Sequence, residues 1–167
     1  ANLIWDLLSS FGMAFVVITI LMVLLLGGLK LGLIAMVPNL MPVIVIMGVM
    51  HLSGIPIDMN NILIASISMG LAVDDTIHLL HHFRVNHLAS GNVEVSIRNA
   101  MMHSGRAMVS TTLILMLGFF VYMGAEMANI QRFGLLIGLT ALFALLIDLF
   151  FAPALLRTFY KRQARSN

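Results

Sequence analysis

The segment LLSSFGMAFVVITILMVLLLGGL, residues 7–29, decides the fold class because it contains no charged residue. A second uncharged run follows almost at once, LGLIAMVPNLMPVIVIMGVM at residues 31–50. A transmembrane helix needs about 20 consecutive apolar residues. Inside a bilayer only helices and closed barrels satisfy every backbone hydrogen bond. These runs lack the alternating pattern of barrel strands, so they predict membrane-spanning helices.

The composition excludes an ordinary soluble domain. Of the 167 residues, 60% are hydrophobic and only 10% are charged, and the mean hydropathy is +1.04. The absence of cysteine excludes disulfides and thiolate metal sites. The basic residues stand beside the apolar runs, so the net charge of +2 does not indicate a nucleic-acid partner. The first residue is Ala and no signal-peptide cleavage pattern follows, so we expect a fragment of a longer chain.

The pattern of apolar runs predicts an all-α integral membrane protein, with residues 1–167 forming one transmembrane domain. We place five spans at about 9–29, 31–51, 61–83, 107–125 and 133–155. The longest connection is Arg84 to Arg106. Within it Val93, Ile97 and Met101 recur at helical spacing, which predicts a separate amphipathic helix over about 92–104. Such a helix lies on the membrane surface or docks a partner.

The basic residues predict the orientation. One side of the predicted bundle holds Lys30, Arg84, Arg98, Arg106, Arg157, Lys161, Arg162 and Arg165, whereas the other holds only Arg132. Cytoplasmic loops are enriched in Lys and Arg. We therefore expect the N-terminus outside and the C-terminus in the cytoplasm.

The second predicted span contains Pro38 and Pro42, which lie four residues apart and so on one face. Proline removes a helical hydrogen bond and bends the helix. We expect a kink there, acting either as a flexible joint or as a static bend filled by a neighbouring helix.

The third predicted span, NILIASISMGLAVDDTIHLLHHFR at residues 61–84, carries two adjacent acids at membrane depth. A carboxylate at the centre of a bilayer costs about 2.5–3.5 kcal/mol on insertion scales, so Asp74 and Asp75 are functional candidates. Ser66, Gly70, Asp74, His78 and His82 are spaced four apart and form one polar stripe. We expect that stripe to face the bundle interior, with Ser66 and Gly70 allowing a neighbouring helix to approach closely.

Two other spans bring polar groups to a similar depth. Ser110, Thr111 and Thr112 lie in the fourth span, and Asp148 lies in the fifth. Burial and a like-charged neighbour favour the neutral form of a carboxylic acid, so such a layer can bind and release protons. The predicted proton relay consists of Asp74, Asp75, His78, Thr111, Thr112 and Asp148. The alternatives are a structural role for Asp148 and hydroxyls bonded to their own helix.

Two enzymatic readings fit poorly. The run from His78 to His82 matches H-x-x-H-H, which resembles one histidine box of membrane di-iron desaturases, but the chain has only six histidines. Asp75 and Asp148 could pair as in an intramembrane aspartyl protease, but the G-x-G-D signature of the presenilin-like family is missing. We expect no enzyme, no catalytic residue, no cofactor and no metal.

Three stretches resemble one family. GLAVDDTIHLLHHFR (70–84) looks like the intramembrane proton motif of the RND (resistance–nodulation–cell division) superfamily, and most of all its MMPL-like hydrophobe and lipid exporters, with Patched a distant relative. GRAMVSTTLILMLGFFV (105–121) and FGLLIGLTALFALLIDLFFAPALL (133–156) agree with it.

The resemblance implies the last five helices of the C-terminal half of a twelve-span exporter in the bacterial inner (plasma) membrane. Asp74 and Asp75 would bind and release protons to drive export of lipids or other hydrophobic compounds. The implied partners are the lipid bilayer, the N-terminal half and an extracytoplasmic domain of the same protein, the hydrophobic substrate and protons. Whether the protein forms an oligomer is left open. Many lipid exporters have Asp-Tyr where this chain has Asp-Asp, which leaves the substrate open. The alternative is a non-transporting membrane module, either sterol-sensing-like or an accessory domain similar to SecD and SecF.

Overall fold

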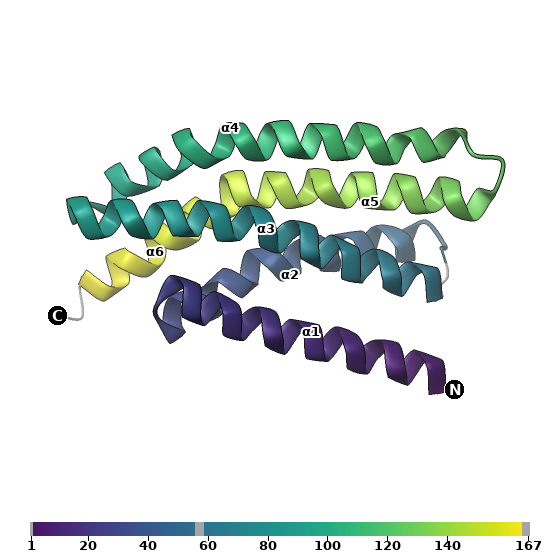
Figure 1. Cartoon of the computed structure of the whole chain (residues 1–167), viewed down its shortest axis with the longest axis horizontal. Coiled ribbons are helices and arrows are strands. Elements are labelled where there is room, and N and C mark those ends of the chain that lie inside the picture. The colour runs from purple at the N-terminus through teal and green to yellow at the C-terminus, as the bar shows by residue number, and fades with distance from the viewer. Residues whose placement is uncertain (1, 56–58, 165–167) are drawn as a thin grey trace.

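The computed structural model describes residues 2–55 and 59–164, and it forms a bundle of long helices that lie side by side (Figure 1). The helices are α1 (Asn2–Leu26), α2 (Leu29–Leu52), α3 (Met59–Ser90), α4 (Val93–Phe120), α5 (Ala128–Leu146) and α6 (Ala152–Ala164). A 3₁₀ turn, η1 (Val121–Gly124), follows α4, and a π-helical turn, η2 (Ile147–Phe151), joins α5 to α6. The described residues contain no strand.

Five segments are long and apolar enough to cross a membrane, which confirms the predicted all-α membrane bundle. They are Ser9–Leu26, Leu29–Leu52, Leu63–Ser90, Val93–Gly124 and Ala128–Tyr160. The fifth segment combines α5, η2 and most of α6, because the helix continues through the π turn instead of ending there.

The connection predicted between Arg84 and Arg106 is different in the structure. Helix α3 continues to Ser90, α4 starts at Val93, and only a two-residue turn containing Gly91 joins them. The prediction of a separate amphipathic helix over 92–104 is therefore wrong, because these residues begin the continuous helix α4. Its apolar residues Val93, Ile97 and Met101 pack against the core of the bundle.

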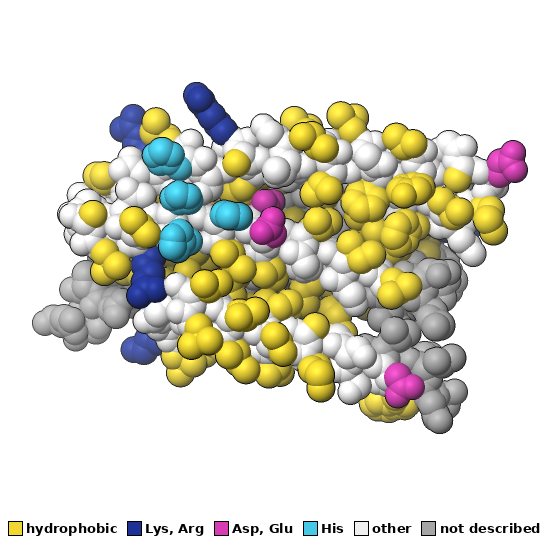
Figure 2. Space-filling model, viewed as in Figure 1, with side chains coloured by type: hydrophobic (Ala, Val, Ile, Leu, Met, Phe, Trp, Pro, Cys, Tyr) yellow, Lys and Arg dark blue, Asp and Glu magenta, His cyan; other side chains and the backbone are white. Residues whose placement is uncertain are grey.

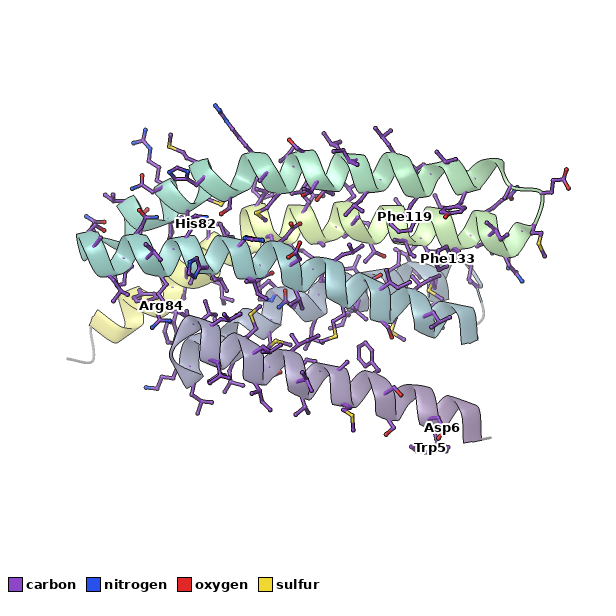
Figure 3. The ribbon with its side chains drawn as sticks, in the orientation of Figure 1. Trp5, Asp6, His82, Arg84, Phe119 and Phe133 are labelled. Atoms are coloured by element: carbon purple, nitrogen blue, oxygen red, sulfur yellow. The ribbon has the colours of Figure 1, made fainter. Side chains whose placement is uncertain are left out.

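Helix α3 occupies the centre of the bundle, where it contacts α1, α2, α4 and α5. The buried face of α2 includes Pro38, Asn39 and Pro42, and the helix runs through both prolines without a break. The kink predicted at Pro38 and Pro42 stays a prediction. At one end of the bundle the rings of Phe119 and Phe133 meet edge to face between α4 and α5, with centroids 6.4 Å apart (Figure 3).

The two ends of the bundle differ in charge. We call the end that carries Lys30, Arg84, Arg98, Arg106 and Arg157 the basic end. Lys and Arg side chains gather at that end, whereas acidic side chains appear at the opposite end (Figure 2). Asp6 lies at the opposite end, near the start of α1 (Figure 3). Of the residues used to predict orientation, Arg165 lies outside the described residues.

Candidate proton-coupling site

The innermost part of the site joins α3 to η2. The Thr76 hydroxyl donates a hydrogen bond of 2.8 Å to Oδ1 of Asp148, and both side chains are buried. The second carboxyl oxygen of Asp148, Oδ2, is buried and has no hydrogen-bond partner in the described part of the chain. Asp148 lies in the π-helical turn. Such turns add one residue to a helical turn and are frequent at functional sites.

The Asp75 carboxyl, which is partly buried, lies next to this pair. The hydroxyl of Thr112 on α4 lies within hydrogen-bonding reach of Asp75 and is itself buried. Asp75 also interacts electrostatically with Asp148. The structure thus brings Asp75, Thr112 and Asp148 together from three helices, as the sequence predicts.

Asp74 points the other way. Its side chain is 77% exposed and that of His78 is 66% exposed, and His78 Nε2 lies 3.7 Å from Asp74 Oδ1. The two residues are one helical turn apart on the outer surface of α3. The expectation that this acid faces the interior of the five-helix bundle is therefore wrong.

The remainder of the polar stripe shares this outward direction. Ser66 and Gly70 are exposed, and a Cβ added at Gly70 would meet no atom of the described chain within 4 Å. The prediction that a neighbouring helix approaches closely is wrong at Gly70 for the described helices of this chain. Periodicity correctly predicts that the residues share one face, but not which way that face points.

Histidines extend the stripe toward the basic end. The rings of His82 on α3 and His103 on α4 are stacked, with centroids 5.9 Å apart and planes 17° apart. The His81 ring meets that of His82 edge to face at 5.9 Å. Histidine side chains gather next to acidic side chains on this face (Figure 2), and His82 is labelled in Figure 3. No group of three or more potential ligands among the described residues is arranged to hold a metal ion.

Thr111 lies apart from the other predicted relay residues. Its hydroxyl donates to the carbonyl oxygens of Ala107 and Met108 in its own helix, at 3.0 and 3.1 Å, and its side chain is exposed. Ser110 is exposed as well. The hydroxyls of α4 therefore divide into Thr112, which faces the acids, and Thr111, which bonds to its own backbone.

Sequence reasoning missed two residues, Thr76 and Asn39. Thr76 directly follows the acid pair. It lies two residues after Asp74, which places it on the opposite side of α3. Asn39 is fully buried, and its Oδ1 has no hydrogen-bond partner among the described residues. It is the only side chain with an amide or hydroxyl group in the run 31–50, and that isolation was the available signal.

Comparison with known proteins shows the family of this chain. The model of the MMPL family matches residues 3–166. The chain belongs to the MMPL family. The chain is 30% identical over 121 residues to “Putative membrane protein MJ1562” of Methanocaldococcus jannaschii, an alignment that covers 72% of this chain. The alignment spans 31% of that relative, so the chain corresponds to about a third of its length. No solved structure matches.

Proposed function

We propose that this MMPL-family chain is the membrane part of a proton-driven exporter of lipids or other hydrophobic compounds, and that it catalyses no chemical reaction. The observation that carries the proposal is the position of Asp74 and Asp75 inside a membrane-spanning segment, with an acid, a threonine and a histidine around them. Acidic residues within spans are costly and often mark proton pathways.

Asp75 would act as the coupling residue between two environments. It lies beside Asp148 and Thr112 on its inner side and next to Asp74 in sequence. A proton on Asp75 removes its repulsion with Asp148, whereas loss of the proton restores it. Because α3 packs against α4 and α5, this change can bias the bundle between two arrangements. Each proton that crosses the membrane releases about 2.3 kcal/mol per 100 mV, which is the energy available for export.

The histidine row would connect Asp74 with water at the basic end. His103, His82 and His81 form successive ring contacts, and His78 lies beside Asp74. Imidazole exchanges protons near physiological pH, so these residues suit proton transfer. Replacement His82→Gln should slow proton movement, whereas His51→Gln, at the other end of the bundle, should leave it unchanged.

The uncovered Asp74 face would contact the N-terminal half of the complete transporter. An exposed carboxylate and imidazole at this depth need a protein or water-filled surrounding instead of lipid. With the basic end in the cytoplasm, the N-terminus lies outside, where an extracytoplasmic domain would meet the substrate. A bacterial inner membrane is the location we propose.

Export by the full-length protein tests the proposal. Cells that depend on it for tolerance of a hydrophobic compound should lose that tolerance with Asp74→Asn or Asp75→Asn. Asp6→Asn is the matched control, because Asp6 is exposed near the far end of α1. Wild-type export by both single variants and by the double variant would refute the proton role and favour a non-transporting membrane module.

A further inference from the structure

A cavity at the basic end lies outside the proposed proton site. It has a volume of about 550 Å³ and is formed by the α1–α2 turn, the end of α3 and α6. Two cationic side chains, Lys30 and Arg84, line it together with the aromatic side chains of Phe159 and Tyr160. Arg84 is labelled in Figure 3, near the turn between α1 and α2.

Arg84 is held in place before any ligand binds. Its Nη1 donates a 2.8 Å hydrogen bond to the carbonyl oxygen of Leu25 near the end of α1. The guanidinium lies over Gly27, where an added Cβ would come within 2.0 Å of Nη2. Gly27 has a φ of +61°, so glycine is favoured there for its conformation as well. A fixed guanidinium retains further N–H donors for the oxygens of a phosphate.

The aromatic wall of the cavity is also well packed. The Tyr160 ring meets those of Phe83 and His87 edge to face, with centroids 5.3 and 4.7 Å apart. The Tyr160 hydroxyl is close enough to Arg84 to interact electrostatically. Tyr160 can therefore present a hydroxyl donor beside the guanidinium without a large loss of side-chain freedom on binding.

The cavity combines these polar groups with apolar surface. Leu29 and Leu88 line it and are 65% and 76% exposed. A free phosphate would leave these side chains in water, whereas a lipid would place its chains against them and its headgroup on the cations. The cavity also lies at the end of the spanning segments, the depth at which headgroups are found.

We propose that the cavity between the α1–α2 turn, α3 and α6 binds the headgroup phosphate of an anionic phospholipid through Arg84, Lys30 and Tyr160. The acyl chains lie along Leu29 and the neighbouring exposed apolar surface of the bundle. Lipid in this position ties α1 and α2 to α3 and α6 at the basic end.

Lipid binding to the full-length protein tests the proposal. Native mass spectrometry would count phosphatidylglycerol and phosphatidylcholine retained by the wild type, Lys30→Gln, Tyr160→Phe and the double variant Lys30→Gln/Arg84→Gln. We expect wild type to prefer phosphatidylglycerol and the double variant to bind it at least about tenfold more weakly, since each basic residue contributes about 1 kcal/mol to binding an anionic lipid surface. Arg106→Gln, which removes an exposed cation at the same end but outside the cavity, should bind as wild type does.

Each other outcome overturns part or all of the proposal. Equal retention of the two lipids by wild type, or wild-type retention by the double variant, would show that the cavity is not an anionic-lipid site. Displacement of phosphatidylglycerol by millimolar inorganic phosphate would identify a soluble anion as the ligand and so exclude the lipid. Arg84→Gln could weaken folding because it also loses the Leu25 contact, so Lys30→Gln, which leaves that contact in place, must show reduced retention by itself.

Discussion

Asp74 and Asp148 are both acids within membrane-spanning segments, but the fold treats them in opposite ways. Asp148 is 1% exposed and accepts a hydrogen bond from a buried threonine on another helix. The Asp74 side chain is 77% exposed, and its Oδ1 lies 3.7 Å from Nε2 of His78, one turn away on its own helix. The comparison teaches that depth in the membrane and direction around the helix are separate properties.

The difference in burial suggests a structural role for Asp148 and a functional role for Asp74. A buried carboxyl with a partner on another helix holds the bundle together, because loss of either partner leaves a polar group unsatisfied. An acid on the outer surface contributes little to the stability of this bundle. Because placing a carboxylate at that depth in the membrane costs free energy, its presence there indicates a functional role. Asp75 is partly buried and interacts electrostatically with both of these acids.

The largest effect expected from the comparison is on transport. Asp74→Asn should lower export by about a hundredfold or more, at the lower end of the contribution of a positioned proton-transfer group. The same change should alter the free energy of unfolding of the five-helix chain by itself by less than about 0.5 kcal/mol, because the side chain is exposed there. Export assays of the full-length protein and denaturant titration of the five-helix chain would check the two expectations. Lost folding together with lost export would mean that Asp74 is structural.

The second effect concerns the buried hydrogen-bonded pair Thr76 and Asp148. Thr76→Val removes the hydrogen bond to Asp148 and leaves that carboxyl without a donor. The free energy of unfolding should therefore fall by about 1–3 kcal/mol. Thr111→Val is the matched control, since its hydroxyl bonds only to its own helix, and it should change stability by less than about 0.5 kcal/mol. Equal effects of the two variants would mean that the Thr76–Asp148 bond does not stabilise the bundle.

Two glycines allow the buried and the uncovered surfaces of the helices to be compared without any change of charge. A Cβ at Gly134 on α5 would lie 2.4 Å from the Phe119 carbonyl oxygen on α4, whereas one at Gly70 would meet no described atom. Gly134→Ala should therefore cost about 1–3 kcal/mol of stability, as overpacking does. Gly70→Ala should leave stability unchanged but reduce export if the outer face of α3 contacts another part of the protein. Unchanged export with Gly70→Ala would argue that this face has no close partner.

The smallest effect on stability is expected at an exposed ion pair. Arg157 and Glu94 form an ion pair of 2.8 Å at the basic end, with both side chains 53% exposed. Arg157→Gln should cost only about 0–1 kcal/mol, and less at high salt. A loss larger than that of Thr76→Val would show that the ends of the bundle, and not its buried acids, determine its stability.

The sequence was sufficient for some of these features and not for others. Run length predicted the five helices, and counting along them placed Asp75, Thr112 and Asp148 in one layer, because depth depends only on residue number. The direction of Asp74 was missed since a polar stripe looks the same whether it faces a core or an uncovered surface. Thr76 was missed because its role depends on Asp148, 72 residues away. The residues around Gly91 were expected to form a long connection, but α3 and α4 both extend toward this short turn.

Infrared spectroscopy of the full-length protein in lipid, recorded as the pH is raised, tests the central claim most directly. A protonated carboxyl has a C=O band that disappears when the acid loses its proton. We predict a titrating band in the wild type that is absent from Asp74→Asn/Asp75→Asn and retained in Asp6→Asn. A double variant whose carboxyl bands titrate as those of the wild type do would contradict the account, because the acids of α3 would then take no part in proton binding.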